Sequence, residues 1–270
     1  MCGIGAFHSV GDELDAGRCA RVLLRLLEVR GRDASGVAWH EDSSQGVETM
    51  ILKGDISGSK LAEQIKPGDI GSTGIVHTRW ATKGSPEVNA NNHPIDVAGI
   101  VGVHNGHVSN DDALFKQIDK SVYSRVGEVD SEAAFAWLAH GDQEIPLLER
   151  MAMVKGNAAL MWLNTNDKRK RLHLARLTSS PLVMGQMKGG SVVAASTEAI
   201  LMEAAKRLNI QFEFVYSFVE GEYAIIEDGR LSEFVEVPMP KVESKLFADV
   251  KALPSYKGYS SYESKSKWGK

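Results

Sequence analysis

The first residue that suggests chemistry is a cysteine in the second position of the chain. Cys2 follows Met1 directly and precedes Gly3, where an apolar run begins. If Met1 is removed, Cys2 carries both a thiol and a free α-amine, whose reference pKa of about 7.7–8.0 lets it accept a proton near neutrality. An N-terminal nucleophile that uses its own amine as base needs no His or Asp partner. The alternative for Cys2 alone is a small buried cysteine without a catalytic role.

A second group of residues that could do chemistry lies at the end of a predicted strand, in the run His77-Thr78-Arg79-Trp80-Ala81-Thr82. The planar guanidinium of Arg79 can hold a carboxylate with two parallel hydrogen bonds, which a lysine cannot do. Trp80 can cover such a site and exclude water. The alternative is an arginine at a strand edge whose aliphatic part packs on the tryptophan.

Asn105 and Gly106 follow the apolar run that ends at His104. Asn-Gly in this context is typical of a hairpin turn. The functional alternative is an oxyanion hole, in which the Asn105 side-chain amide and the Gly106 N–H point at the same developing negative charge. Glycine permits the close approach that this requires.

Asp130 stands at the start of a predicted helix, where capping alone would explain it. Alternatively, its carboxylate holds a substrate ammonium group, so that Arg79 and Asp130 clamp the two charged ends of an amino acid. A metal site is a further alternative, raised by His77, His93, His104 and His107. Their spacing fits no closed zinc pattern, and neither cysteine belongs to a CxxC pair. We therefore expect no metal and no cofactor.

The apolar pattern predicts the elements that hold these side chains. Residues 15–29 carry Cys19 and several leucines at helical spacing, which predicts a helix with Cys19 on its apolar face. Two more helices are predicted at 131–140 and 197–208. Strands are predicted at 3–8, 36–39, 50–52, 73–77, 99–104, 158–163, 172–175, 182–184, 192–195, 223–227 and 231–235, with a hairpin at Asp228-Gly229. Strands interspersed with few helices predict the α+β class, with two antiparallel sheets and helices packed outside.

Composition narrows the class of protein. The chain has 270 residues, of which 43% are hydrophobic, enough for a sizeable core. A net charge of -4 argues against nucleic acid as a partner. No run approaches the roughly 20 apolar residues that span a bilayer, and the first residues do not resemble a secretory signal. Two cysteines are too few for a disulfide framework. We therefore expect a cytoplasmic protein with no membrane partner.

The composition changes after Val237. Pro238 and Pro240 end the last predicted strand, and the remaining residues lack periodicity. We predict a folded domain over 1–237 and a flexible C-terminal tail over 238–270. Residues 254–270 carry four aromatic residues and four lysines, which makes them a candidate docking segment. The alternative is a solvated terminus without a role.

Taken together, the motifs resemble the class II glutamine amidotransferases, which are N-terminal-nucleophile hydrolases. The resemblance covers residues 1–237 and rests on the order of its motifs: Met-Cys-Gly-Ile at 1–4, Arg-Gly-Arg-Asp-Ala-Ser-Gly at 30–36, residues 77–82, Asn92-His93-Pro94, His104-Asn105-Gly106 and Asp130. Within the class, residues 77–82 and Ser180-Pro181-Leu182-Val183 are most similar to the glutaminase domain of the glutamine–fructose-6-phosphate aminotransferases.

The resemblance implies a fold and a role for each matching residue. The fold is a four-layer αββα sandwich of two antiparallel sheets. The implied roles are these: Cys2 is nucleophile and base, Asn105 and Gly106 form the oxyanion hole, Arg79 and Thr82 bind the glutamine carboxylate, Asp130 binds its α-amino group, Trp80 lies on a mobile cover, His93 lines the site, and Arg30 and Asp33 shape the floor around Cys2.

The implied activity is hydrolysis of the glutamine side-chain amide through a Cys2 thioester, giving glutamate and ammonia. The sequence departs from the family pattern at Lys83, where histidine is usual, and at Arg32, where tyrosine is common. No sugar-phosphate isomerase half is expected after residue 237, so we expect a separate synthase chain to accept the ammonia. Two alternatives remain: an uncoupled amidase that acts on another γ-glutamyl compound, and a non-catalytic regulatory module that kept the pocket.

Overall fold

The computed structural model describes residues 1–44 and 46–239, and Met1–Met239 form one compact unit. The boundary predicted between residues 237 and 238 stays a prediction. Apart from Pro238 and Met239, the predicted tail lies outside the described residues, as does the whole candidate docking segment 254–270.

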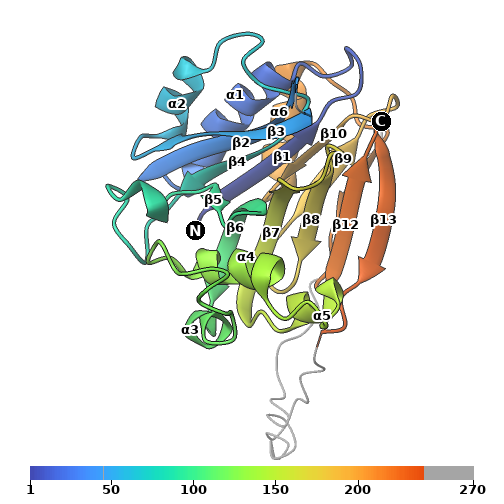
Figure 1. Ribbon diagram of the computed structural model, residues 1–270. Helices are drawn as coiled ribbons and strands as arrows, with labels where there is room; N and C mark the ends of the chain where they lie inside the picture. The colour runs from blue at the N-terminus through green and yellow to red at the C-terminus, as the bar shows by residue number, and fades with distance from the viewer. Residues whose placement is uncertain (45, 240–270) are drawn as a thin grey trace, which may run out of the picture. The chain divides into compact units, whose positions relative to one another are not determined.

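Two antiparallel sheets form the centre of this unit (Figure 1). In the first, seven strands follow the order β11-β9-β10-β1-β4-β2-β3. Their bounds are β1 Gly3–His8, β2 Ala34–Ser43, β3 Gly46–Gly54, β4 Thr73–Arg79, β9 Val183–Gln186, β10 Val192–Ala195 and β11 Phe214–Ser217. In the second, six strands follow the order β13-β12-β8-β7-β6-β5. Their bounds are β5 Ile95–Asp96, β6 Ile100–Val108, β7 Gly156–Asn164, β8 Leu172–Arg176, β12 Glu222–Glu227 and β13 Arg230–Glu236.

Helices cover the outer face of each sheet. Against the first sheet lie α1 (Ala16–Leu27), α2 (Gly58–Gln64) and α6 (Glu198–Leu208), and on the side of the second lie α3 (Asp111–Phe115), α4 (Asp130–His140) and α5 (Leu147–Ala152). Two 3₁₀ turns, η1 (Glu28–Arg30) and η2 (Asn89–Asn91), complete the set for the described residues. None of the helices in residues 1–44 and 46–239 has the length and apolar character needed to cross a membrane.

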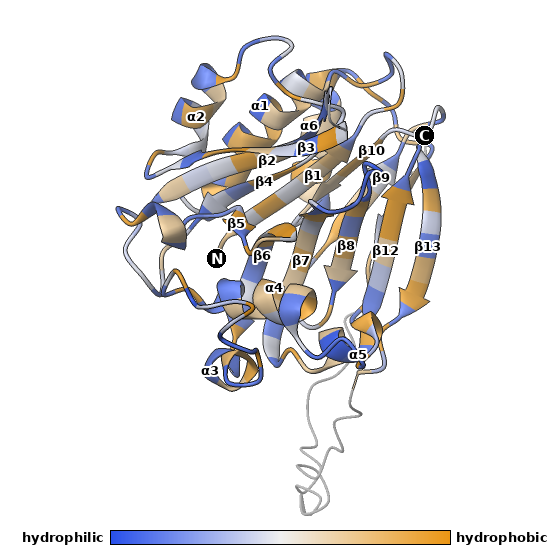
Figure 2. Cartoon of the chain, viewed as in Figure 1, coloured by the Kyte–Doolittle hydropathy of each residue, from blue (hydrophilic) through white to orange (hydrophobic). Residues whose placement is uncertain are grey.

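The alternation of side chains along β1 explains why four layers form. Ile4 and Ala6 point into the layer between the sheets, where they join Val103 of β6. Phe7 points the other way and packs with the apolar face of α1. At the edge of the second sheet, β13 is largely exposed, and its colours in Figure 2 alternate between hydrophilic and hydrophobic. The buried strands therefore pack against the other sheet on one face and against helices on the other face, which gives the predicted αββα sandwich.

Helix α1 begins and packs as its sequence predicts. The Asp15 carboxylate accepts a hydrogen bond from Arg18 N at 2.8 Å, an N-cap that stabilises a helix by about 1 kcal/mol. Its buried face includes Cys19, Leu23 and Leu27. The hairpin predicted at Asp228-Gly229 is also confirmed, since both residues have positive φ between β12 and β13.

Two interpretations of single motifs are wrong. The hairpin-turn interpretation of Asn105-Gly106 fails because both residues lie inside β6, where they pair with Ala159 and Ala158 of β7. The capping interpretation of Asp130 fails because Val129 is the N-cap residue and Asp130 is already helical. The short elements α2, α3, α5, β5 and β11 were not predicted.

Candidate active site

Cys2 lies directly before β1, at the end of the central strand of the first sheet. Arg30 donates from Nε to the Cys2 carbonyl oxygen at 2.9 Å, and the Cys2 thiol donates to the Trp80 carbonyl oxygen at 3.7 Å. Burial raises the pKa of the Cys2 thiol, although the Trp80 contact and the nearby Arg79 charge act against this. The thiol is therefore protonated near neutral pH, and a base is needed to make it nucleophilic.

Cys19 lies in a different environment. It is fully buried in the apolar core beneath α1, and burial strongly raises the pKa of its thiol. A buried thiol of this kind is unreactive. The structure therefore separates the two cysteines, as the sequence predicts.

The loop at residues 30–33 forms the surface next to Cys2. The Asp33 carboxylate accepts from Ala81 N at 2.7 Å, and Asp33 N donates to the Arg79 carbonyl oxygen at 3.0 Å. Arg30 has a buried Nη2 with no hydrogen-bond partner among the described residues. A hollow of about 220 Å³ beside Cys2 is lined by Met1, Val29, Arg30 and Trp80.

Residues 80–86, which we call the cover segment, are held in place by hydrogen bonds from Arg79. This residue is 3% exposed. Its Nη2 donates to the carbonyl oxygens of Lys83 and Gly84 at 2.6 and 2.7 Å, and its Nη1 donates to Asn92 Oδ1 at 2.9 Å. The guanidinium was predicted to bind substrate, but much of it already binds the protein. Trp80 and Thr82 stand exposed on the same segment.

Asn92 links Arg79 to the cover segment, a role that the sequence analysis missed. Besides accepting from Arg79, its side chain donates from Nδ2 to the Pro86 carbonyl oxygen at 2.7 Å. Its backbone carbonyl accepts from Lys53 Nζ at 2.7 Å, and burial lowers the pKa of Lys53 to about 8. The motif Asn92-His93-Pro94 was the available signal for Asn92, while Lys53 had none.

Three histidines lie buried behind the site, between the two sheets. The rings of His77 and His93 stack with centroids 4.1 Å apart. His77 donates from Nε2 to the His104 carbonyl oxygen at 3.2 Å, which links β4 to β6. Burial lowers the pKa of His77 to about 3 and that of His93 well below its usual value, so both are neutral at pH 7. His93 is therefore a packed neutral ring, and its predicted role in lining the site stays a prediction.

Asn105 and Gly106 present two N–H donors on β6. Asn105 is 1% exposed, and its side-chain Nδ2 has no hydrogen-bond partner among the described residues. Gly106 has φ +145°, and a Cβ there would lie 1.8 Å from the Asn157 carbonyl oxygen. Only glycine fits this position. A buried amide without a partner costs about 1–3 kcal/mol, which is expected where a ligand supplies the acceptor.

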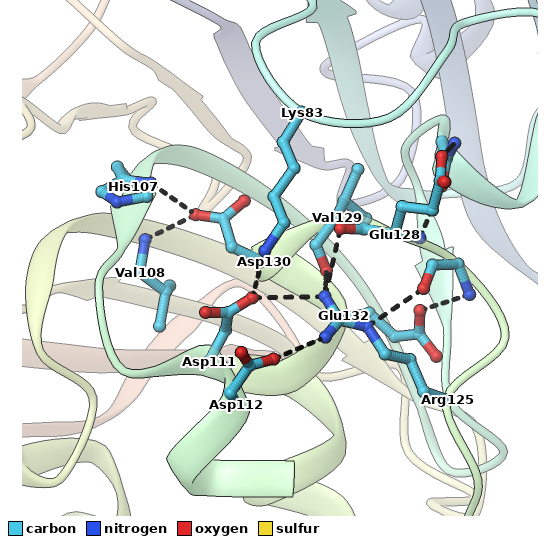
Figure 3. A network of polar contacts seen from close by, with 12 residues as sticks. Lys83, His107, Val108, Asp111, Asp112, Arg125, Glu128, Val129, Asp130 and Glu132 are labelled. Atoms are coloured by element: carbon cyan, nitrogen blue, oxygen red, sulfur yellow. Dashed lines mark hydrogen bonds and ion pairs between the residues drawn. The ribbon is translucent and has the colours of Figure 1, made fainter.

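Asp130 is the acidic residue of the site (Figure 3). Its Oδ2 accepts from Val108 N at 2.6 Å and lies 3.2 Å from His107 Nδ1. Asp130 is close enough to Cys2 and Arg79 to influence the pKa of both groups. The structure thus brings the predicted nucleophile, cation and anion together. No cluster of three or more His, Cys, Asp or Glu side chains suited to a metal ion occurs in the described part of the chain.

Comparisons with known proteins agree with this arrangement. The family model described as glutamine amidotransferases class-II matches residues 27–161. The glutamine–fructose-6-phosphate aminotransferase of Salmonella typhi is 30% identical over 280 residues, which cover 97% of this chain and 42% of that protein. The homologous enzyme of Corynebacterium glutamicum is 29% identical over 236 residues, covering 83% of this chain and 37% of that protein. The chain thus spans about two fifths of the length of these relatives.

A solved structure supports the fold. Glutamine phosphoribosylpyrophosphate amidotransferase from B. subtilis matches with a TM-score of 0.69 and 19% identity, over 88% of this chain and 50% of that chain. The predicted α+β sandwich is therefore confirmed both by its layers and by this likeness. The chain belongs to the class II glutamine amidotransferases.

Proposed function

We propose that the chain hydrolyses the side-chain amide of glutamine, with Cys2 as the nucleophile after removal of Met1. The observation that carries this proposal is the buried Asn105 amide beside Gly106, a donor without a hydrogen-bond partner in the described part of the chain. In this role Asn105 Nδ2 and Gly106 N–H bind the oxygen of the tetrahedral intermediate. Neither donor is charged, so both suit an oxygen that gains negative charge only during the reaction.

The reaction proceeds in two halves. The Cys2 sulfur bonds to the amide carbon while the thiol proton passes to the α-amine. The carbon–nitrogen bond then breaks, and the leaving nitrogen takes that proton and departs as ammonia. Water attacks the resulting γ-glutamyl thioester and gives a proton to the amine. The carbon–sulfur bond breaks, glutamate leaves and the thiol is restored.

Two charged groups orient the substrate. Asp130 is 12% exposed at its side chain, and its Oδ1 has no bonded partner among residues 1–44 and 46–239. We assign it to the α-amino group of glutamine. The Arg79 N–H groups that do not bind the protein, together with Thr82 on the cover segment, bind the carboxylate. Trp80 covers the bound substrate, His93 supports the site from behind, and Arg30 and Asp33 fix Cys2 and the cover segment.

The ammonia acceptor belongs to the same proposal. The relatives are named as aminotransferases, and this chain matches about two fifths of them. We propose that a synthase on another chain takes up the ammonia, and that both work in the cytoplasm, where Cys2 stays reduced. The purified chain alone should then release glutamate and ammonia from glutamine in equal amounts.

The test of the nucleophile compares the two cysteines. Cys2→Ala should abolish glutamine hydrolysis because no other exposed thiol is available, whereas Cys19→Ala should keep it. An electrophilic glutamine analogue should add once, at Cys2, in protein whose intact mass lacks Met1. The readouts are glutamate release and peptide mass spectrometry.

Three outcomes would count against this assignment. Labelling of Cys19 with Cys2 unmodified would exclude Cys2 as the nucleophile. Full activity in protein that keeps Met1 would exclude the α-amine as the base. Faster turnover of another γ-glutamyl compound than of glutamine would favour the uncoupled amidase.

A further inference from the structure

Lys83 makes the one ion pair by which the cover segment contacts α3 among the described residues. Its Nζ lies 2.5 Å from Asp111 Oδ2, and the two side chains are 46% and 12% exposed (Figure 3). Asp111 is the first residue of α3 and follows the last residue of β6, Val108, by three positions. The Lys83 side chain is therefore already paired within the protein, at a position where the family pattern usually has histidine.

We propose that Lys83 is a positioning residue whose ion pair with Asp111 fixes the cover segment to α3 and so determines the affinity for glutamine. The inference rests on the proposed function for its substrate, but the ion pair itself does not depend on it. Lys83 contacts the acidic side of α3, and its backbone carbonyl accepts from Arg79 at 2.6 Å. The residue thus joins the proposed carboxylate-binding group to the opposite wall of the site.

The other hydrogen bonds that hold the cover segment come from residues outside α3. Ala81 N donates to Asp33, Gly84 O accepts from Arg79, and Ser85 O accepts from Asn91 Nδ2 at 3.2 Å. These hydrogen bonds fix the path of the backbone near β4. Among the described residues, the Lys83 side chain makes the only ion pair from the segment to α3, so its loss should free one edge of the cover and leave the rest attached.

A second cation also holds the Asp111 carboxylate to which Lys83 binds. Arg125 Nη2 lies 3.2 Å from the same Oδ2 atom, and Arg125 is held in turn by Asp112 at 3.0 Å and by the carbonyl oxygens of Gly127 and Glu128. Although burial acts in the other direction, hydrogen bonds from Lys83 and Arg125 lower the pKa of Asp111. Arg125 thus gives the Asp111 carboxylate a second cationic partner that does not depend on Lys83.

A positioning role predicts a particular kinetic change. Lys83 Nζ pairs with Asp111, and no hydrogen bond or ion pair joins Lys83 to Cys2 among the described residues, so its loss should weaken substrate binding without altering the chemical step. A half-exposed ion pair of this kind changes an equilibrium by up to about fivefold. We expect Lys83→Gln to raise the glutamine KM by about that factor with kcat nearly unchanged, and Lys83→Arg to restore the KM.

The experiment combines kinetics with amide hydrogen exchange of residues 80–86 in the full chain without substrate. Lys83→Gln should speed exchange in the cover segment, and the double variant Lys83→Gln/Asp111→Asn should add little to the single change. Lys116→Gln at the C-cap of α3 is the matched control, since this exposed lysine has no ion pair among the described residues. It should alter neither readout.

The outcomes separate this inference from the proposed function. Unchanged exchange and unchanged KM in Lys83→Gln would overturn the inference, and so would a fall in kcat at constant KM. Faster exchange in a chain that does not hydrolyse glutamine would support the ion pair and refute the glutaminase. An equal effect of Lys116→Gln would show that positive charge in general, and not this pair, controls the segment.

Discussion

Cys2 and Asn105 divide the proposed reaction between a protonated thiol and a neutral amide. Burial keeps the thiol protonated, so the proposed reaction depends on the α-amine that removal of Met1 would expose. The buried Asn105 amide contributes little to the free enzyme, since it has no protein partner in the described part of the chain. The Asn105 amide should contribute stabilisation only when the oxyanion forms.

Replacement of Asn105 tests this division. Asn105→Ala removes a donor used mainly in the transition state, so kcat should fall by about 10²–10³ with a much smaller change in KM. Thermal stability should not fall much, because no hydrogen bond of the folded protein is lost. Steady-state kinetics and a melting curve of the same preparation provide both numbers. A large rise in KM at constant kcat would instead assign Asn105 to ground-state binding.

At the residue scale, the motifs predict which residue types lie at the site but not which contacts these residues make. Cys2, Arg79, Asn105 and Asp130 stand out in the sequence because the proposed reaction requires their residue types, and their roles stay predictions. The contacts of Arg79 with Asn92 and with the cover segment depend on how distant segments meet, which no local pattern contains. Lys53 was missed for the same reason, since a buried lysine in a strand looks like a surface residue.

At the scale of elements, the length of a helix or strand determined whether the sequence predicted it. Helix α1 has 12 residues and repeats its apolar pattern several times, whereas α3 has five residues and shows less than two turns. The Asn105-Gly106 pair favours a turn locally, but pairing of β6 with β7 along nine residue pairs overrides that preference. Position in the sheet, and not propensity, therefore exposes the proposed oxyanion donors.

Gly36 shows how one residue positions an element. On β2 its missing side chain lets the His93 carbonyl approach, because a Cβ there would lie 2.1 Å from that oxygen. Gly36→Ala should push the segment that carries Asn92 away from Arg79, raise the glutamine KM and destabilise the fold by about 1–3 kcal/mol. Denaturant unfolding and kinetics would measure both effects.

Gly54 on the neighbouring strand β3 offers the matched control. A Cβ at Gly54 would meet only Ile56, at 3.9 Å. Gly54→Ala should therefore change stability by no more than about 0.5 kcal/mol and leave the KM as it is. Equal effects of the two substitutions would mean that both act through strand propensity, and that the contact with His93 is unimportant.

At the scale of the whole molecule, the two-sheet core buries several neutral histidines. Burial lowers the pKa of each of these histidines, which are His8, His40, His77, His93, His104 and His173. An unfolded histidine has a pKa near 6.5, so between pH 6.5 and the folded value the unfolded chain binds more protons. Acid should therefore destabilise the fold before most carboxylates titrate.

His173 allows this effect to be measured away from the active site. Its ring stacks on Trp162 with centroids 4.8 Å apart, and Nδ1 lies 2.7 Å from the Tyr223 hydroxyl. Burial, helped by the charge of Arg171, lowers the pKa of His173 to about 3. The folded protein thus keeps this ring neutral between pH 6.5 and 5, where the unfolded chain protonates it. Stability should rise with pH across that window and level off above it.

The last prediction compares the slope of stability against pH in two proteins. The unfolding free energy of the natural chain should fall as pH drops from 6.5 to 5, at up to about 1.4 kcal/mol per pH unit for each buried neutral histidine. His173→Gln removes one of these groups, so its slope should be shallower by about that amount, whatever its stability at pH 7. Urea unfolding at four pH values, with an unchanged m-value as the check on two-state behaviour, measures both slopes. Parallel slopes would mean that His173 takes up its proton in the folded state, and that the stacked ring is not held neutral by the core.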